Sequence, residues 1–202
     1  MQTETKEYQE YLGNKYLPGR SIYMSKFFYP KIFKEFGKNG IIADLGCGYG
    51  EFLNYCKKKN RQSIGIDSNK QLIDICLKNG HQALVDNICE LNGLKDKNIQ
   101  HFISDNVLEH LSTPEIDTFF EKLSKLIPEN GLFVCIVPGP KGFEKDPTHK
   151  TFVTKQLIEN TISKYRLKIK KHYKHPINLG IVSRLLYLNM DVFVISRTKY
   201  QY

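Results

Sequence analysis

The chain has 202 residues, of which 41% are hydrophobic and 25% are charged, and it carries a net charge of +9 at pH 7. This apolar content predicts one globular domain with a core and excludes an intrinsically disordered chain. No apolar run approaches the roughly 20 residues of a membrane-spanning helix, and the first 16 residues resemble neither a signal nor a transit peptide. We therefore expect a cytoplasmic protein, whose positive charge allows nucleic acid, membrane surfaces or anionic metabolites as partners.

The five cysteines are odd in number and never form a Cys-x-x-Cys pair. They stand mostly inside apolar stretches, so we predict small buried side chains and neither a disulfide framework nor a zinc knuckle. No metal ion is expected from the sequence.

Residues 1–38 are polar and aromatic, with a helix-like spacing that predicts one or two amphipathic helices interrupted near residues 17–19. We interpret this segment as a helical lid on a single domain at 39–202. In that domain strands are predicted at 40–45, 63–66, 82–85, 99–104, 132–137, 166–173 and 191–197. Helices are predicted at 51–59, at 69–78, after Thr113 and after Thr154, the two threonines being their N-caps. Alternating strands and helices predict an α/β sheet with helices on both faces.

The first strand ends in the pattern Asp-x-Gly-x-Gly-x-Gly, which begins at Asp44. Gly46 and Gly48 allow a sharp turn and a close approach to a ligand. The dinucleotide pattern Gly-x-Gly-x-x-Gly requires a glycine at position 51, where this chain has Glu51. A carboxylate at position 44 would repel a pyrophosphate but would hold a cationic amino-acid group. A nicotinamide-dependent dehydrogenase is therefore disfavoured.

Two more acids follow the next two strands. Asp67 stands about 20 residues after Asp44, where a carboxylate is placed to accept the ribose hydroxyls of an adenosine. Asp86 follows the third strand and would accept from an adenine amino group, while Ile88 packs on the ring. The alternatives are structural, since Asp67 would also suit a helix cap and Asp86-Asn87 a common turn.

With these residues the chain resembles the class I S-adenosylmethionine-dependent methyltransferases, in particular small single-domain members that act on metabolites, sugars or lipids. The resemblance covers about residues 41–197 and rests on IIADLGCGYGEFL, IGIDSN, VDNI, SDNVLEHL, GLFVCIVPG and DPTHKTFVT. It implies a Rossmann-like, mostly parallel seven-stranded sheet of order 3-2-1-4-5-7-6, with the last strand antiparallel.

The resemblance also implies the cofactor S-adenosyl-L-methionine, which would leave as S-adenosyl-L-homocysteine. The residues expected to bind it are Asp44, Gly46, Cys47, Gly48, Asp67, Ser68, Asp86, Asn87, Ile88, Ser104, Asp105 and Asn106, with Arg20 pairing with the cofactor carboxylate.

A hydroxyl acceptor must lose its proton as it attacks the methyl group, and histidine is suited to this at neutral pH. His149 lies in the loop after the fifth strand and is our candidate base, with Asp146 orienting it or binding substrate. The alternative is a surface histidine in a loop fixed by Pro147. We expect Glu109-His110 to anchor the turn after the fourth strand, the alternative being a substrate contact for His110.

We expect a small-molecule acceptor, with methylation of a hydroxyl on a sugar, a glycan precursor or another metabolite. Residues 160–190 contain seven Lys or Arg and no Asp or Glu, a pattern that suits an anionic acceptor or RNA, or else an edge strand protected by lysines. Nucleic acid is less favoured, because no aromatic residues suited to base stacking accompany these cations. An RNA methyltransferase and a non-catalytic cofactor-binding subunit remain alternatives. Residues 180–190 would wall the acceptor pocket or form the surface of a homodimer.

Overall fold

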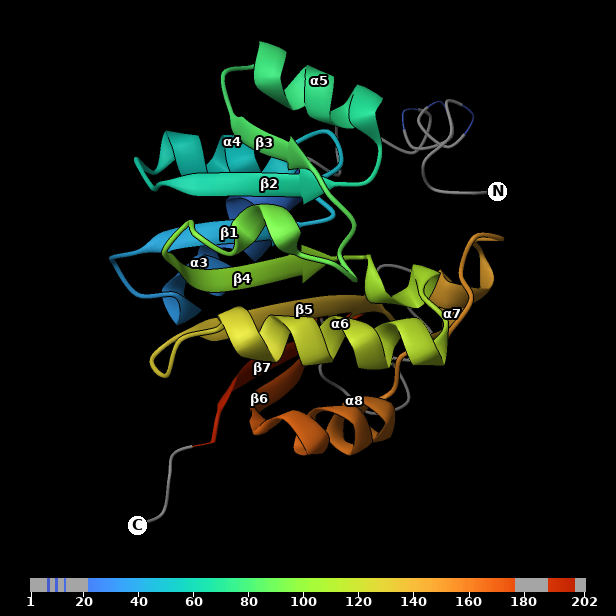
Figure 1. The fold of residues 1–202 in the computed structure, drawn as a ribbon. Coiled ribbons are helices and arrows are strands. Elements are labelled where there is room, and N and C mark those ends of the chain that lie inside the picture. The colour runs from blue at the N-terminus through green and yellow to red at the C-terminus, as the bar shows by residue number, and fades with distance from the viewer. Residues whose placement is uncertain (1–6, 8–9, 11–12, 14–21, 177–188, 199–202) are drawn as a thin grey trace.

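The computed structural model describes residues 7, 10, 13, 22–176 and 189–198. A single seven-stranded sheet runs through it in the order β3-β2-β1-β4-β5-β7-β6 (Figure 1). Its strands are β1 (Ile41–Leu45), β2 (Ser63–Asp67), β3 (Gln82–Val85), β4 (Ile99–Asp105), β5 (Leu132–Pro138), β6 (Leu167–His175) and β7 (Met190–Arg197). The first five strands are parallel, and β7 lies antiparallel between β5 and β6. The predicted fold class and strand order are confirmed.

Helices pack on both faces of this sheet, as the alternating pattern predicts. They are α3 (Tyr29–Glu35), α4 (Glu51–Lys58), α5 (Lys70–Lys78), α6 (Thr113–Leu126), α7 (Pro140–Glu144) and α8 (Lys155–Ile162). Strand β5 is buried along its whole length because it lies between two apolar cores. Phe133 packs in the core with α6 and α8, whereas Val134 packs in the core with α3 and α4. Among the residues described, no helix is long and apolar enough to cross a membrane.

The described part of the N-terminal segment covers one face of the sheet. A short π-helix, η1 (Met24–Phe28), leads into α3, and Phe28 and Ile32 are fully buried against the sheet. The buried side chains of η1 and α3 therefore belong to the core. The predicted break at residues 17–19 and most of residues 180–190 lie outside the described residues.

Of the two predicted N-caps, one is found in the structure and the other differs by one residue. Thr154 caps α8, its Oγ1 accepting from the N–H of Leu157 at 3.1 Å. The cap of α6, however, is Ser112 and not Thr113, because Ser112 forms a reciprocal capping box with Glu115. The Ser112 N–H donates to Glu115 Oε2 at 2.7 Å. The shift by one residue makes Thr113 the first helical residue of α6.

β6 lies at the edge of the sheet, as expected if its lysines protect an edge strand. β6 pairs with β7 alone among the described strands, and Lys168 and Lys170 on it are exposed. Charged side chains on such an edge discourage pairing with a second chain.

The cap assignment can be tested by stability. We expect Ser112→Ala to lower the free energy of unfolding by about 1 kcal/mol, which corresponds to about 2–4 °C in Tm for a chain of this size. Thr113→Ala is the matched control and should change stability by less than about 0.5 kcal/mol. Urea unfolding followed by circular dichroism measures both variants, and a larger loss in Thr113→Ala would contradict the assignment.

Candidate functional site

The glycine turn after β1 combines one tightly packed position with one open position. Gly46, Gly48 and Gly50 all have positive φ, at 76°, 51° and 76°. A Cβ on Gly46 would lie 2.6 Å from Cγ2 of Val107, so glycine is required where this turn meets the chain after β4. A Cβ on Gly48 would have nothing within 4 Å. The turn therefore borders open space at Gly48, where a ligand can approach the backbone.

Asp67 joins this turn to the end of β2. Its Oδ2 accepts from the Gly48 N–H at 3.0 Å, and its Oδ1 accepts from the Asn69 N–H at 2.9 Å. The N-cap of α5 is Asn69, whose side chain accepts from Gln71 and Leu72, so Asp67 is not that cap. Each carboxylate oxygen has a second lone pair. Asp67 can thus hold both loops and still accept from the hydroxyls of a ligand.

The carboxyl ends of β1, β2 and β4 bring several acids together. Asp44 is 3% exposed. Burial raises its pKa well above the usual value, and the negative charges of Asp105, Asp67 and Glu51 raise it further. Burial also raises the pKa of Asp67, although its two backbone hydrogen bonds oppose that shift. A cationic ligand at this edge would offset the repulsion among these carboxylates.

The third predicted acid is engaged in its own loop. Asp86 Oδ2 accepts from the Gly93 N–H at 2.8 Å, and Asn87 Oδ1 accepts from the Cys89 N–H at 2.8 Å. Asp86 and Asn87 therefore form the turn that the structural alternative predicts. Ile88 is 9% exposed and packs in the core beside α6.

The remaining predicted cofactor residues differ in their access to this edge. Ser104 is fully buried, and Cys47 is also buried. Ser68, Asp105 and Asn106 are half-buried. The side-chain N–H of Asn106 donates to Asp105 Oδ1 at 2.7 Å. Arg20 lies outside the described residues.

His149 is turned into the protein from the loop between α7 and α8. Its side chain is only 7% exposed. His149 is therefore not the surface histidine of the alternative interpretation. Nδ1 lies 2.9 Å from the carbonyl oxygen of Phe143. Nε2 lies 3.5 Å from Asp146 Oδ2 and 3.8 Å from Glu109 Oε1. The structure thus brings the two predicted catalytic residues together and adds Glu109.

Glu109 and His110 belong to the short turn η3 (Leu108–His110) after β4. The Glu109 carbonyl accepts from the N–H groups of Lys150 and Thr151 at 2.8 and 3.1 Å, so this turn anchors the His149 loop. The His110 ring centroid lies 4.9 Å from that of His149. We predicted the anchoring role but not this meeting of the two histidines, because 39 positions separate them in the sequence and only the fold adjoins the two loops.

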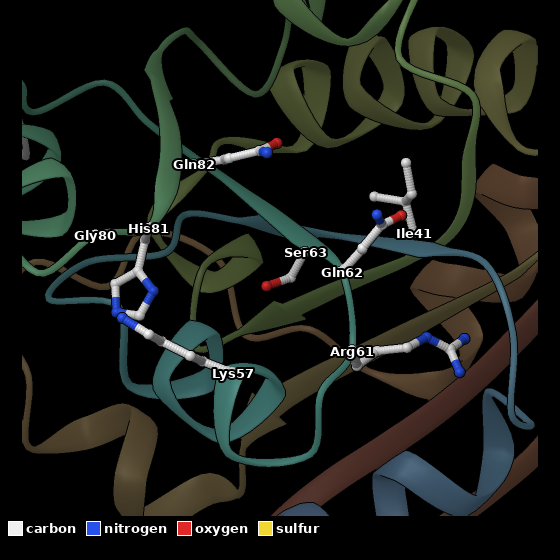
Figure 2. A pocket seen from close by; sticks show the side chains of 8 residues that line it. All are labelled: Ile41, Lys57, Arg61, Gln62, Ser63, Gly80, His81 and Gln82. Atoms are coloured by element: carbon white, nitrogen blue, oxygen red, sulfur yellow. The ribbon is translucent and has the colours of Figure 1, made fainter.

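A pocket of about 250 Å³ lies away from these residues, and Figure 2 shows the side chains that line it. Its walls come from the starts of β1, β2 and β3 and the adjoining loops: Ile41, Lys57, Arg61, Gln62, Ser63, Gly80, His81 and Gln82. The Arg61 guanidinium is engaged with the backbone carbonyls of residues 37, 39 and 40. This cavity lies at the amino ends of the strands and holds none of the predicted site residues.

The crowding of acids predicts a pH-dependent stability. Because the pKa of Asp44 is raised by folding, ionising this side chain favours the unfolded chain, and the folded protein loses stability as the pH rises from about 4 through that raised pKa. We expect Asp44→Asn to remove this loss and to raise the ligand-free Tm at pH 8 by about 2–4 °C, or about 1 kcal/mol.

Differential scanning calorimetry between pH 5 and 8 measures this effect. The matched control is Asp74→Asn, in an exposed ion pair on α5. The prediction is wrong if the advantage of Asp44→Asn over the wild type shrinks as the pH rises.

Comparison with known proteins relates this chain to methyltransferases. Residues 43–135 match the model of the methyltransferase domain. A mouse tRNA (carboxymethyluridine(34)-5-O)-methyltransferase is 33% identical over 84 residues, which are 41% of this chain and 12% of that protein. A tabtoxin biosynthesis enzyme of Pseudomonas amygdali pv. tabaci is 24% identical over 151 residues, or 69% of this chain and 59% of the relative. This chain therefore spans less than two thirds of the length of either relative.

Solved structures show the same architecture. A SAM-dependent methyltransferase from Archaeoglobus fulgidus superposes with a TM-score of 0.66 at 20% identity, covering 84% of this chain and 90% of the other. The matched domain includes the glycine turn, Asp67, Asp86 and Glu109. Residues 43–135 thus match a methyltransferase domain, and the sheet has the architecture of a solved SAM-dependent methyltransferase.

Proposed function

We propose that the protein transfers the methyl group of S-adenosylmethionine to a hydroxyl of a small-molecule acceptor, such as a sugar, a glycan precursor or another metabolite. The observation that carries the proposal is the placement of His149. It is held by the turn after β4, on the same edge of the sheet as the acids that suit the donor.

The donor half of the site fits the cofactor in charge and in shape. S-adenosylmethionine brings an ammonium and a sulfonium carrying an already activated methyl group. Asp44 and Asp105 offer the carboxylates that a cationic amino-acid group requires, and Gly48 borders open space. In this proposal Asp67, at the end of β2, would accept from the ribose hydroxyls, and the loop of Asp86 with Ile88 would lie against the adenine.

In the acceptor half, His149 would take the proton of the hydroxyl. Since Nδ1 faces the Phe143 carbonyl, a neutral His149 carries its proton on Nδ1 and its lone pair on Nε2. The acceptor O–H proton would pass to Nε2 while the new O–C bond forms and the C–S bond breaks. Asp146 and Glu109 lie within 4 Å of Nε2 and would stabilise the resulting imidazolium.

The charges near β6 favour a small acceptor over RNA. Three of the basic residues of that region are paired with acids, Lys164 with Asp117, Lys171 with Glu35 and Lys174 with Asp191. These pairs reduce the positive potential that a phosphate backbone would contact. The mouse relative is named for a tRNA substrate, but this chain corresponds to only 12% of it.

The donor site is tested by ligand-induced stabilisation. At about 100 times its Kd, S-adenosylhomocysteine or S-adenosylmethionine should add about 2.7 kcal/mol, or about 5–10 °C in Tm, whereas NADH should add nothing. Asp67→Asn replaces one acceptor oxygen by a donating amide, so it should lose most of this shift, while Asp74→Asn should keep it. Equal shifts in both variants would refute the role of Asp67, and no shift in the wild type would refute the methyltransferase activity.

The base role of His149 is tested by turnover. Screening sugars, nucleotide sugars and hydroxy acids by mass spectrometry for methylated product identifies an acceptor. With it, His149→Ala should lower kcat about 100-fold or more and leave the S-adenosylhomocysteine shift unchanged. His172→Ala is the control, since His172 also faces a carboxylate, that of Asp191, but on β6 and β7, away from the His149 loop. Undiminished turnover in His149→Ala would remove the base role.

A further inference from the structure

Three side chains with metal-binding groups meet where the turn after β4 touches the loop after α7. Glu109, His110 and His149 each offer a ligand atom, and these atoms lie within 4.8 Å of one another. Two ligand atoms held about 2.1 Å from one ion are at most about 4.2 Å apart. Side-chain adjustments of well under an ångström would thus close the three groups around a single ion. Two imidazoles with one carboxylate form a ligand set that divalent transition metals bind.

The hydrogen-bond partners of both imidazoles favour the tautomer with the proton on Nδ1, which leaves Nε2 able to bind a metal ion. Nδ1 of His149 faces the Phe143 carbonyl at 2.9 Å, and Nδ1 of His110 lies 3.3 Å from the Thr148 carbonyl and 3.1 Å from its Oγ1. A proton on each Nδ1 leaves the lone pair on each Nε2. Histidines that bind metals commonly donate their other N–H to a backbone carbonyl in this manner.

The charge of the cluster also suits a cation. Glu109 is fully buried and Asp146 is 8% exposed, and the carboxylates of both lie within 4 Å of Nε2 of His149. Thr148 supports the arrangement, because its N–H and its hydroxyl both donate to Asp146 Oδ1, at 2.9 and 2.6 Å. Buried carboxylates of this kind are stabilised by a cation or by a metal ion.

We propose that Glu109, His110 and His149 bind one divalent transition-metal ion, Zn²⁺ or Mn²⁺, which coordinates the oxygens of the methyl acceptor. This inference rests on the proposed methyl transfer to a hydroxyl, and it gives His149 the role of a metal ligand in place of that of the base. Three protein ligands leave positions open on the ion. The acceptor it selects carries two neighbouring oxygens, as in a vicinal diol or an α-hydroxy carboxylate, because both can bind the same ion.

The ion changes how the hydroxyl is activated. Coordination lowers the pKa of the acceptor O–H, whose proton leaves to solvent water and whose oxygen stays on the ion as an alkoxide. The alkoxide then forms the O–C bond to the methyl group as the C–S bond breaks. His149 acts in this form as a ligand, and its lone pair is no longer available to take a proton.

The test is a titration of chelator-treated protein with ZnCl₂ or with MnCl₂ alone, by calorimetry for zinc and by electron paramagnetic resonance for manganese. We expect one ion per chain with a Kd below about 10 μM for at least one metal. His110→Ala and His149→Ala should weaken binding at least about 100-fold, and Thr148→Val, which keeps all three ligands, about 10–100-fold. His172→Ala should bind the ion as the wild type does.

The S-adenosylhomocysteine shift is measured on every variant and separates the two proposals. A variant that retains this shift is folded, so its weakened metal binding reports the ligand set. The metal site would be overturned if wild-type protein that retains the S-adenosylhomocysteine shift bound the metal with a Kd above about 10 μM. It would also be overturned if neither His110→Ala nor His149→Ala weakened metal binding. Either result would leave the methyltransferase proposal standing. Absence of the shift in the wild type would overturn the proposed function itself.

Discussion

The two hydrogen bonds accepted by Asp67 connect the parts on which the donor site depends. One fixes the glycine turn after β1 and the other fixes the start of the chain that leads into α5. Both loops therefore take their positions from a single side chain at the end of β2. Because Gly46 packs against Val107 in turn, the same unit reaches the chain after β4. The geometry of the strand ends is thus set by direct contacts among the first, second and fourth strands.

This unit carries a cost in electrostatic free energy. Asp44 is buried among acids that raise its pKa, and the repulsion among these carboxylates lowers the free energy of unfolding. The arrangement becomes favourable when a cation lies among the carboxylates. Functional sites commonly hold such destabilising charges, which the rest of the fold supports. Here the support comes from two apolar cores on opposite faces of the sheet, with β5 buried between them.

Much of the fold could be predicted from the sequence because its signals are local. Continuous apolar runs mark the inner strands, and the glycines and acids at their ends mark the ligand edge. The antiparallel insertion of β7 came instead from the family resemblance. The one-residue error at the α6 cap arose because Ser112 and Thr113 are both good caps, and only Glu115 selects between them. Ser104 lies inside β4, which continues to Asp105, and its side chain is fully buried, so its part in cofactor binding stays a prediction.

The acceptor half was less predictable because it depends on contacts between distant segments. His149 was identified by its loop, while Glu109 and His110 were assigned a structural part. Nothing local indicates that the backbone of Glu109 would hold Lys150 and Thr151 and so bring His149 beside it. The acceptor itself depends on walls that include residues outside the described part of the chain.

Methyl transfer requires that the carboxylates at the strand ends bind a cationic donor. Isothermal titration of S-adenosylmethionine into wild-type protein, Asp44→Asn and Asp74→Asn tests this directly. We expect a loss of affinity of about tenfold or more in Asp44→Asn, equivalent to at least about 1.4 kcal/mol, and none in Asp74→Asn. Equal affinity in Asp44→Asn and the wild type would contradict it.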